Sequence, residues 1–389
     1  MERRALEPEN AQSAAAMLAS LQASGQTVQL HGNRTKLRTW LPADTVVPMS
    51  TAKLTAGFAH YAGDLVATIP AGWTLRAAND ALRQERQWLP LDPPFSDDAT
   101  IGGIVATNDS GPRRQRYGSP RDLVIGMEVA LTNGTVARSG GRVVKNVAGY
   151  DLSRLFCGSH GSLGLISSVT FKLSPVAPAS CTVVASFTTL AQACEAALVL
   201  STNASITPST LELSSSGCQL LVRYETTPGA CQRMAAETVA TLRTTASTVA
   251  VVSDDAEQTL WAAHQRDESP ATGLIIRLAV LPTLASAALD DVARLAGEFG
   301  VEWSATGRPA LGVLRLRASG DAGAVQRFTA ALHVAIAVRG GHMQCGGDLS
   351  LLDGELEALG SPGTAAAVGF AVKQRFDAAG LLPYAWSQS

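Results

Sequence analysis

Residues 100–111 read TIGGIVATNDSG, and this stretch decides the fold. The paired glycines, Gly102 and Gly103, let the backbone come within hydrogen-bond distance of phosphate oxygens, and the small polar residues after them can reach the edge of a polar ring. The glycine spacing is not GxGxxG, so no Rossmann site is predicted, and the chain contains no P-loop motif. We therefore predict a cofactor-binding loop of a different type.

Three other glycine-containing turns are candidates for the same site. The turn 31–36 (HGNRTK) follows a short apolar strand, and its amides and basic side chains suit a pyrophosphate, although it also fits an ordinary basic surface turn. The turn 70–72 (PAG) joins a strand to a helix and offers free N–H groups. The turn 158–166 (GSHGSLGLI) can line a flat aromatic ligand with main-chain amides.

Composition narrows the class of protein. A chain of 389 residues exceeds what one hydrophobic core usually organises, so we expect roughly two or three domains. Its 46% hydrophobic and 16% charged residues predict a folded chain rather than a disordered one. A net charge of −2 gives no electrostatic reason to expect nucleic acid as a partner. The basic cluster Arg113, Arg114 and Arg116 is either a solvated loop or a phosphate or subunit contact.

Cysteine spacing and the N-terminal residues indicate a cytoplasmic protein. The six cysteines form no CxxC pair and do not cluster with histidine, so they indicate buried free thiols and neither zinc nor iron–sulfur ligation. Near the N-terminus, Arg3 and Arg4 are followed by Glu7, Pro8 and Glu9 instead of an apolar stretch, which argues against a signal peptide. No run approaches the length of a membrane span.

Hydrophobic periodicity predicts an α+β chain with two lobes and a cap domain. The first lobe, about 1–95, should contain a helix at 10–24, strands at 28–30, 45–48 and 64–69, and a helix at 75–87. The second lobe, about 96–176, should contain strands at 123–132, 135–139 and 164–173, the first two joined by the hairpin signal Asn133-Gly134. The two lobes together form the first predicted domain, 1–176.

Pro175 and Pro178 then mark the start of a cap domain at 177–345, which a return segment at 346–389 follows. Strands and helices should alternate here, in an α+β sheet with helices on one side. The predicted strands lie at 182–187, 220–224, 274–280 and 311–317, and the predicted helices end near 200, 242, 299 and 338.

The order of motifs resembles a known family. PAG, TIGGIVATNDSG, Tyr117-Gly118, Asp122, KNVAGYDL (145–152) and GSHGSLGLI together resemble the FAD-binding module of the vanillyl-alcohol oxidase and p-cresol methylhydroxylase (PCMH) flavoprotein superfamily. Within it, WLPLDPP (88–94), SGPRRQRYGSPRDLVIG (110–126) and SGGRVVKNVAGYDLSRLF (139–156) are similar to FAD-binding E subunits of bacterial glycolate oxidases. The resemblance covers about the first 175 residues, and the rest only in length and pattern.

The resemblance implies a two-lobed PCMH-type FAD-binding domain followed by an α+β cap, with FAD extended between the lobes and its pyrophosphate on main-chain amides. Covalent relatives carry a histidine within or just after the pyrophosphate turn, whereas His31 precedes Gly32 here, so the resemblance implies non-covalent FAD. The residues implied to line FAD are Gly32, Asn33, Arg34, Thr35, Lys36, Pro70, Gly72, Thr100, Gly102, Gly103, Asn108, Ser110, Gly111, Tyr117, Gly118, Asp122, Gly161 and Ile166.

Catalytic residues are harder to place. Flavin oxidation of a 2-hydroxy acid needs a base for the hydroxyl proton and a cation for the carboxylate. His342, in an element Gly340-Gly341-His342 that resembles one in the family, is the best candidate for proton transfer, against the alternative of a hydrogen-bonded histidine on a buried strand. Arg277, Arg315 and Lys373 are candidate carboxylate partners. The six histidines are scattered, so no metal site is expected.

Two segments leave their roles open. Lys145, Asn146 and Tyr150 belong to a motif shared with the family and either face the flavin or form a structural loop. His160 stands where relatives carry an apolar residue, which favours packing. The Asn-Pro-Gly turn with which relatives return to the flavin is missing near the C-terminus, which puts flavin contacts from that end in doubt.

The resemblance implies an FAD-binding subunit of a glycolate oxidase complex that oxidises glycolate to glyoxylate. Its partners would be a flavin D subunit and an iron–sulfur F subunit, and it would meet the inner membrane only peripherally, through that complex. Two alternatives stay open: an assembly or electron-relay subunit without its own substrate chemistry, and a stand-alone FAD-linked dehydrogenase of another 2-hydroxy acid.

Overall fold

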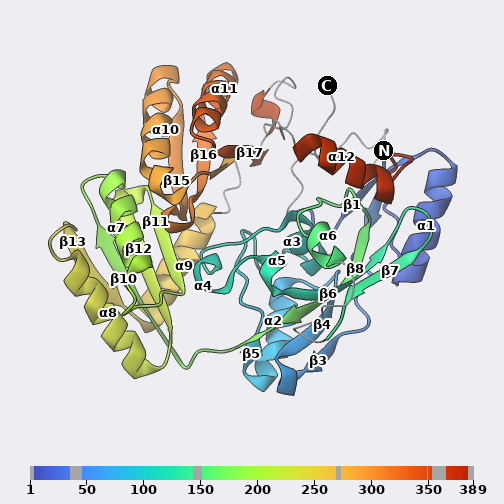
Figure 1. The fold of residues 1–389 in the computed structure, drawn as a ribbon, viewed down its shortest axis with the longest axis horizontal. Helices are drawn as coiled ribbons and strands as arrows, with labels where there is room; N and C mark the ends of the chain where they lie inside the picture. Colours follow the sequence, from blue (N-terminus) through green and yellow to red (C-terminus); the bar gives the residue numbers. More distant parts are fainter. Residues whose placement is uncertain are drawn as a thin grey trace. The chain divides into compact units, whose positions relative to one another are not determined.

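The structure is a computed structural model that describes residues 4–35, 46–142, 151–268, 273–347, 349–352 and 365–383. The chain forms two compact units. Unit 1 comprises Met1–Gly111, Tyr117–Val176 and Ser361–Ser389, and unit 2 comprises Pro112–Arg116 and Ala177–Gly360. Both units combine sheets with helices (Figure 1), as the sequence predicts for an α+β fold. The predicted division into 1–176, 177–345 and a return segment at 346–389 stays a prediction.

Unit 1 contains strands β1 (Thr27–His31), β2 (Val46–Ser50), β3 (Ala59–Tyr61), β4 (Val66–Pro70), β5 (Gln87–Trp88), β6 (Val124–Ala130), β7 (Val136–Gly140), β8 (Leu165–Lys172) and β9 (Ser174–Pro175). Its helices are α1 (Ala11–Ala23), α2 (Leu75–Leu82), α3 (Ile101–Thr107), α5 (Pro120–Leu123), α6 (Leu152–Phe156) and α12 (Ala365–Phe376), with 3-10 turns η1 (Ala62–Asp64) and η2 (Arg83–Glu85). The short helix α4 (Arg114–Tyr117) includes residues of both units.

The main sheet of unit 1 has the order β3-β4-β8-β6-β7, and all of its pairs are antiparallel. Alternating apolar residues of β4 and β8, such as Ile69, Val169 and Phe171, are fully buried and pack with α2 and α3 in one core. The β6–β7 hairpin turns at Asn133-Gly134, where Gly134 has φ +84°, so the sequence prediction of this hairpin is confirmed.

A second layer of unit 1 contains β1, β2 and α1. β1 and β2 pair in parallel, and Val28 and Met49 pack with Leu18 of α1 in a small core of their own. Asn10 caps α1 through its side-chain oxygen, which accepts a hydrogen bond from Ser13 N at 2.8 Å. The predicted helix at 10–24 is therefore confirmed, and its strand partner β1 ends where the turn at 31–35 begins.

Unit 2 contains strands β10 (Ala179–Ser186), β11 (Thr210–Ser214), β12 (Gln219–Thr226), β13 (Thr248–Val252), β14 (Leu274–Ala279), β15 (Glu302–Arg308), β16 (Val313–Ser319) and β17 (His342–Gly347). Its helices are α7 (Leu190–Thr202), α8 (Pro228–Leu242), α9 (Asp254–Glu268), α10 (Ala285–Phe299) and α11 (Ala322–Val338). The 3-10 turns are η3 (Ser216–Cys218), η4 (Pro282–Leu284), η5 (Pro309–Leu311) and η6 (Leu349–Leu352).

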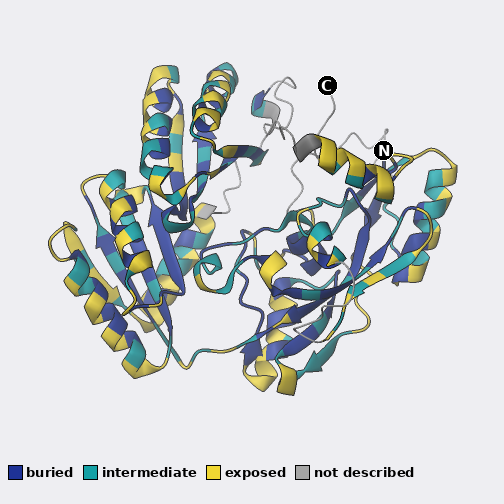
Figure 2. Cartoon of the chain, in the orientation of Figure 1, coloured by how far each residue is buried: buried dark blue, intermediate teal, exposed yellow. Residues whose placement is uncertain are grey.

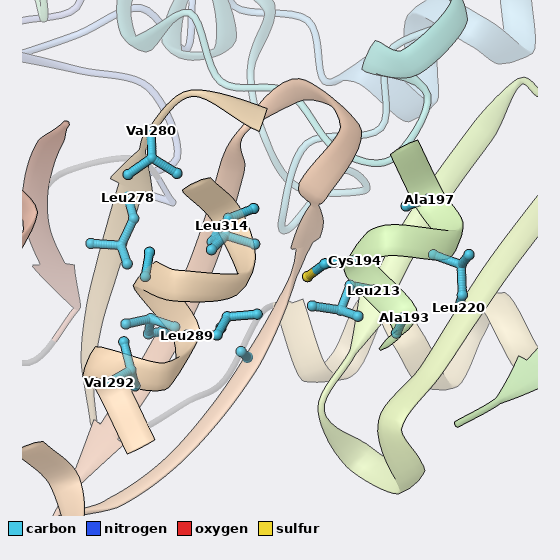
Figure 3. Close-up of a cluster of buried hydrophobic side chains, with 14 of the residues drawn as sticks. Ala193, Cys194, Ala197, Leu213, Leu220, Leu278, Val280, Leu289, Val292 and Leu314 are labelled. Carbon is cyan, nitrogen blue, oxygen red and sulfur yellow. The ribbon is translucent and has the colours of Figure 1, made fainter. Parts of the chain in front are cut away.

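All strands of unit 2 join one antiparallel sheet with the order β13-β10-β12-β11-β15-β16-β14-β17. One face is apolar and packs against α7, α8, α10 and α11, because every second residue of each strand is apolar. Figure 3 shows this core where Leu213 and Leu314 of the sheet lie near Cys194 of α7 and Leu289 of α10. Figure 2 shows the same helices buried toward the sheet and exposed on their outer sides.

Helix α9 packs on the other face of this sheet, so the expectation of helices on one side only is wrong. Trp261 Nε1 donates to Thr182 Oγ1 at 2.9 Å, and Glu257 pairs with Arg223 at 2.9 Å. Thr182 and Arg223 alternate with the core residues Val183 and Val222, so they lie on the second face. The prediction failed because α9 is rich in charged residues and is attached to the sheet by polar contacts rather than by an apolar stripe.

Two arginines of the basic cluster at 113–116 form contacts within unit 2, and its role as a solvated loop or as a phosphate or subunit contact stays open. Arg113 donates to both oxygens of the Glu225 carboxylate, with Nη2 at 2.9 Å from Oε1, and Arg116 Nη1 donates to the Glu225 carbonyl at 3.3 Å. Glu225 is buried, and Arg223 lies 3.8 Å from its Oε1. A buried carboxylate is thus neutralised by two guanidinium groups.

This ion pair predicts an acid-sensitive unit 2. Burial alone would raise the pKa of Glu225, but Arg113 and Arg223 hold that pKa below its ordinary value. A carboxylate with a lowered folded pKa stabilises the fold above its unfolded pKa of about 4.3 and loses that contribution as the pH falls through the folded value. We expect Glu225→Gln to lower the free energy of unfolding at neutral pH by about 2 to 4 kcal/mol.

Urea unfolding of both proteins from neutral pH to about pH 3 checks this, because the wild type should lose stability in acid more steeply than Glu225→Gln. The exposed Glu298, on α10, supplies a matched control: Glu298→Gln should keep the wild-type acid slope. Parallel acid slopes for wild type and Glu225→Gln would contradict the prediction.

The cysteines of this chain are not joined by disulfide bonds. All six cysteines are free, and burial raises the pKa of Cys157, Cys181 and Cys194 to about 12, so these thiols are poor nucleophiles at neutral pH. The prediction of free thiols is therefore confirmed, whereas burial holds for four of them and Cys157 and Cys218 are only partly buried. Among the residues that the structure describes, no helix has the length and apolar character needed to cross a membrane.

Candidate functional site

The turn at 31–35 and the start of α3 lie directly against each other in unit 1. A Cβ on Gly32 would stand 2.1 Å from Thr100 Oγ1, so only glycine allows the two segments this close. Asn33 Nδ2 also donates to the carbonyl of Asp98 at 2.8 Å, and His31 O accepts from Thr51 N at 2.9 Å. The structure therefore brings together the first two glycine-containing segments singled out in the sequence.

The paired glycines belong to helix α3 rather than to a loop. Thr100 caps this helix with its hydroxyl oxygen, which accepts from Gly103 N at 3.3 Å. Gly102 N donates to Ala71 O at 2.9 Å, and a Cβ on Gly102 would lie 3.0 Å from the Ala71 side chain. Gly102 therefore serves close packing of α3 on the 70–72 turn, and its amide is already engaged.

The 70–72 turn is held on its other side by the segment at 51–54. Gly72 N donates to Leu54 O at 3.0 Å, and a Cβ on Gly72 would stand 2.3 Å from Thr51 O. Pro70 is buried at the end of β4. The free amides expected at this turn are thus used within the protein for Ala71, Gly72 and Gly102, and the turn shapes the site by steric fit.

The segment 108–122 is fixed by capping contacts. Asn108 ends α3 in the left-handed conformation with φ +48°, and its Oδ1 accepts from Arg121 N at 3.1 Å. Asp122 Oδ2 accepts from Ser119 N at 2.7 Å and from Ser119 Oγ at 2.8 Å. Both side chains therefore set the course of the loop that carries Ser110, Gly111 and Gly118.

Close packing sets the rest of that loop. A Cβ on Gly111 would stand 1.9 Å from the Asp92 carbonyl, and one on Gly118, where φ is +82°, would lie 2.8 Å from the Asp122 side chain. The ring of Tyr117 meets that of Trp88 edge to face, with centroids 6.0 Å apart. WLPLDPP (88–94) and SGPRRQRYG (110–118) are therefore neighbours in the fold.

The loop at 158–164 closes the same set of segments. Gly158 N donates to Val105 O at 3.1 Å and His160 N to Ala106 O at 2.7 Å, which ties the loop to the end of α3. A Cβ on Gly161 would approach Leu30 of β1 at 3.6 Å, an ordinary contact, so this loop also lies beside the strand that leads into the 31–35 turn. Ile166, by contrast, lies in β8 and packs in the hydrophobic core.

These segments lie together in unit 1. The 31–35 turn, α3 with the loop that follows it, and the 158–164 loop come together, and close contacts of Gly32 with Thr100 and of Gly111 with the Asp92 carbonyl leave no room for a side chain at either glycine. The site also carries a positive charge at Arg34, where the backbone has φ +60°. Lys36, Lys145, Asn146 and Tyr150 lie outside the described residues. Among the other predicted FAD residues, the structure brings together those of the 31–35 turn, α3, the 108–118 loop and the 158–164 loop.

His31 stands at the edge of this arrangement. Its Nδ1 lies 2.8 Å from the carbonyl oxygen of Gly32, and burial lowers the pKa of the imidazole despite that hydrogen bond. The ring is therefore neutral at neutral pH and does not act as a cation toward a phosphate. The non-covalent binding of FAD expected from this histidine's position stays a prediction.

The candidates for substrate chemistry in unit 2 share one sheet face. Arg277 of β14 stands opposite Arg315 of β16 and Gln344 of β17 in the strand register. His342 lies two residues before Gln344 in β17. These residues alternate with core residues, so they belong to the second, polar face. His342 is exposed, which contradicts the alternative of a histidine on a buried strand.

Lys373 is not a carboxylate partner for a substrate. Its ammonium is buried in unit 1, pairs with Asp377, and donates to Ser162 O and Leu382 O at 2.8 Å each. All three of its protons are thereby used. Asp377 was not among the predicted site residues, although a lysine followed four residues later by an aspartate is the sequence signal for such a pair.

Within the described ranges, no three side chains of histidine, cysteine, aspartate or glutamate gather in a way that could hold a metal ion.

Comparison with known proteins identifies the part of the chain that carries this site. Residues 3–140 match the family model of an FAD binding domain. Unit 1 thus contains an FAD-binding domain of the PCMH type, and the match implies FAD as the cofactor. The fold expected from the sequence, such a domain followed by an α+β region with a large antiparallel sheet, is confirmed.

Relatives with similar sequences match over part of the chain. The chain is 45% identical over 113 residues to glycolate oxidase subunit GlcE of Escherichia coli (strain K12), covering 29% of this chain and 32% of that protein. It is 43% identical over 112 residues to subunit GlcD of Bacillus subtilis (strain 168), covering 29% of this chain and 24% of GlcD. It is also 34% identical over 172 residues to a D-lactate dehydrogenase of Archaeoglobus fulgidus, covering 44% of this chain and 38% of that enzyme.

These matches span less than two fifths of the relatives' own length. The chain is thereby related to glycolate oxidase subunits and 2-hydroxy-acid dehydrogenases over part of its length.

Solved structures extend the likeness of fold to the whole chain. An alkyldihydroxyacetonephosphate synthase superposes with a TM-score of 0.74 at 14% sequence identity, covering 98% of this chain and 76% of that one. A second crystal form of a synthase of that name gives a TM-score of 0.69 at 15% identity, covering 96% of this chain and 75% of that one. At such identity the likeness concerns the fold alone.

Proposed function

We propose that this chain is the FAD-binding subunit of a glycolate oxidase complex, in which it takes part in oxidising a short 2-hydroxy acid to the 2-oxo acid. The observation that supports this most is the 45% identity to GlcE over 113 residues of this chain. Glycolate is the proposed substrate and glyoxylate the product.

FAD is proposed to bind without a covalent bond along the converging segments of unit 1. The 31–35 turn and Ser110 would hold the pyrophosphate, and the 158–164 loop would line the flavin ring. When bound, FAD supplies a hydride acceptor for the carbon that carries the substrate hydroxyl. The protein's own contribution there is steric, because close-packed glycines keep each segment in position.

The polar face of the unit 2 sheet suits the substrate. Arg277 and Arg315 lie opposite each other in the register and would bind the carboxylate, since guanidinium groups match carboxylate geometry. His342 lies on the same face and is exposed, so it can receive the hydroxyl proton. His342 is therefore our candidate general base.

A partner is proposed to remove the electrons. The sequence contains no CxxC pair or other cysteine cluster for an iron–sulfur centre, so electrons from FAD would pass to an iron–sulfur partner corresponding to the F subunit. The D subunit would supply the second flavin. Through these partners the chain would lie at the cytoplasmic side of the inner membrane.

The test is anaerobic reduction of the FAD-loaded chain. We expect glycolate to bleach the flavin absorption when the chain is co-purified with its partners, and His342→Gln to slow this bleaching by at least about 100-fold, the usual scale for a lost general base. Arg277→Met should instead raise the glycolate concentration needed for half-maximal rate. Arg294→Met, an exposed change on α10, is the matched control and should leave both quantities unchanged.

Three outcomes would contradict the proposal in different ways. Failure of the chain to bind FAD would overturn the cofactor assignment. Photoreduction of the bound flavin without reduction by glycolate, even with partners present, would favour the electron-relay alternative. Full turnover by the isolated chain would overturn the subunit assignment and favour a stand-alone dehydrogenase.

A further inference from the structure

The buried pair Lys373 and Asp377 joins three parts of unit 1 at one point. Lys373 Nζ donates to the carbonyls of Ser162 and Leu382 at 2.8 Å each and pairs with Asp377. Asp377 in turn accepts from Leu381 N at 3.0 Å and from Leu382 N at 2.8 Å. Both side chains are buried, so every contact is made away from solvent.

One of these parts is the 158–164 loop, which is proposed to line the flavin. Its backbone has positive φ at Gly158, His160 and Gly161, so it follows no regular element that would hold it in shape. The end of α3 binds one side of the loop through Gly158 N and His160 N. Lys373 binds the other side through the buried Ser162, which makes this lysine the loop's second anchor.

The other part is β1, which leads into the 31–35 turn. Leu381 O accepts from Val28 N at 2.8 Å, so the residues that Asp377 orients pair with this strand. Leu381 and Leu382 also pack in the small core with Val28. The pair therefore connects the two segments that the proposed FAD site places at the flavin and at the pyrophosphate.

We infer that Lys373 and Asp377 are positioning residues for FAD, which set the 158–164 loop and the 31–35 turn in the arrangement that binds the cofactor. This inference rests on the FAD site of the proposed function. It differs from a purely structural role because it ties the pair to cofactor affinity rather than to folding. The C-terminal segment, whose flavin contacts were in doubt, thus positions the flavin site through its contacts with the 158–164 loop and β1.

The test separates folding from cofactor binding. Lys373→Met alone leaves Asp377 as a buried charge without its lysine and lowers stability for that reason, so the informative variant is the neutral double change Lys373→Met/Asp377→Asn. We expect it to fold, as judged by the urea midpoint of the apoprotein, but to bind FAD at least tenfold more weakly and to shift the flavin midpoint potential.

Lys53→Met is the matched control, because Lys53 forms an exposed ion pair with Glu7 in the same unit. It should keep the wild-type FAD affinity and potential. Wild-type FAD affinity and potential in the double variant would overturn the inference. If the double variant does not fold, Lys373→Arg gives the same comparison, since it keeps the charge beside Asp377 and misplaces the contact with Ser162.

Failure of the inference and failure of the proposed function give different results. If the wild-type chain itself does not bind FAD, the cofactor assignment fails. If the wild type binds FAD and the neutral double variant binds it equally well, only the positioning role fails. Hydrogen exchange of the peptide 157–165 supplies an independent readout, because loss of the second anchor should speed exchange in that loop.

Discussion

Replacement of Gly111 by alanine is expected to abolish FAD binding by unit 1. The added Cβ would stand 1.9 Å from the Asp92 carbonyl oxygen and 2.8 Å from the carbonyl carbon, so the obstacle is backbone that cannot rotate away. The two segments must separate, and Ser110 and Tyr117 move with them. We expect the free energy of unfolding to fall by about 3 kcal/mol and FAD affinity by at least about 100-fold.

The measurement is FAD titration of the refolded apoprotein by flavin fluorescence, together with urea unfolding. Gly63→Ala is the matched control, because Gly63 is exposed in the same unit and its Cβ would meet nothing within 4 Å. It should change neither quantity. Wild-type FAD affinity in Gly111→Ala would show that the 108–118 loop has no part in binding the cofactor.

Replacement of Glu212 by glutamine is expected to destabilise unit 2 strongly. Glu212 is fully buried in β11, with His264 Nε2 at 3.5 Å from Oε1 and Arg308 Nε at 3.7 Å from Oε2. The neutral side chain removes the negative charge beside a buried guanidinium. The loss from breaking a buried ion pair on one side is about 3 to 5 kcal/mol.

A double-mutant cycle checks this prediction. Glu212→Gln/Arg308→Met should lose less stability in urea than the sum of the two single changes, because the double variant leaves no buried charge without its partner. The exposed pair of Arg294 and Glu298 provides the control cycle, with an expected coupling of less than about 0.5 kcal/mol. Additive losses at Glu212 and Arg308 would mean that the two side chains do not interact.

The spacing of apolar residues predicted most helices and strands, because each apolar stripe lies within a single stretch of the sequence. The β6–β7 hairpin and helix α11 follow directly from alternating or helical apolar positions. Helix α9 was missed because its face toward the sheet carries Glu257, Trp261 and His264, whose partners lie on strands far away in the sequence. A polar interface of this kind leaves no apolar period to detect.

The sequence predicted which segments belong to the candidate site, but not which contacts their residues form. Gly102 and Gly72 were predicted to offer free amides to the cofactor. Their amides instead donate to neighbouring carbonyls, and the absence of a side chain allows neighbouring segments to pack closely against them. Thr100 before the glycine pair was a helix cap, and reading it as such would have predicted α3 instead of a loop. Contacts such as Gly111 with Asp92 depend on tertiary packing, which a local pattern does not contain.

The placement of α12 has a consequence for biosynthesis. Phe376 packs edge to face on Phe156, and Leu381 pairs with β1, so unit 1 is completed by residues 365–383. Those residues leave the ribosome after all of unit 2 has been synthesised. Domains usually fold in the order of synthesis, but here the cap can acquire its core while the earlier unit is still unfinished. We therefore expect FAD to bind only after the cap has been translated.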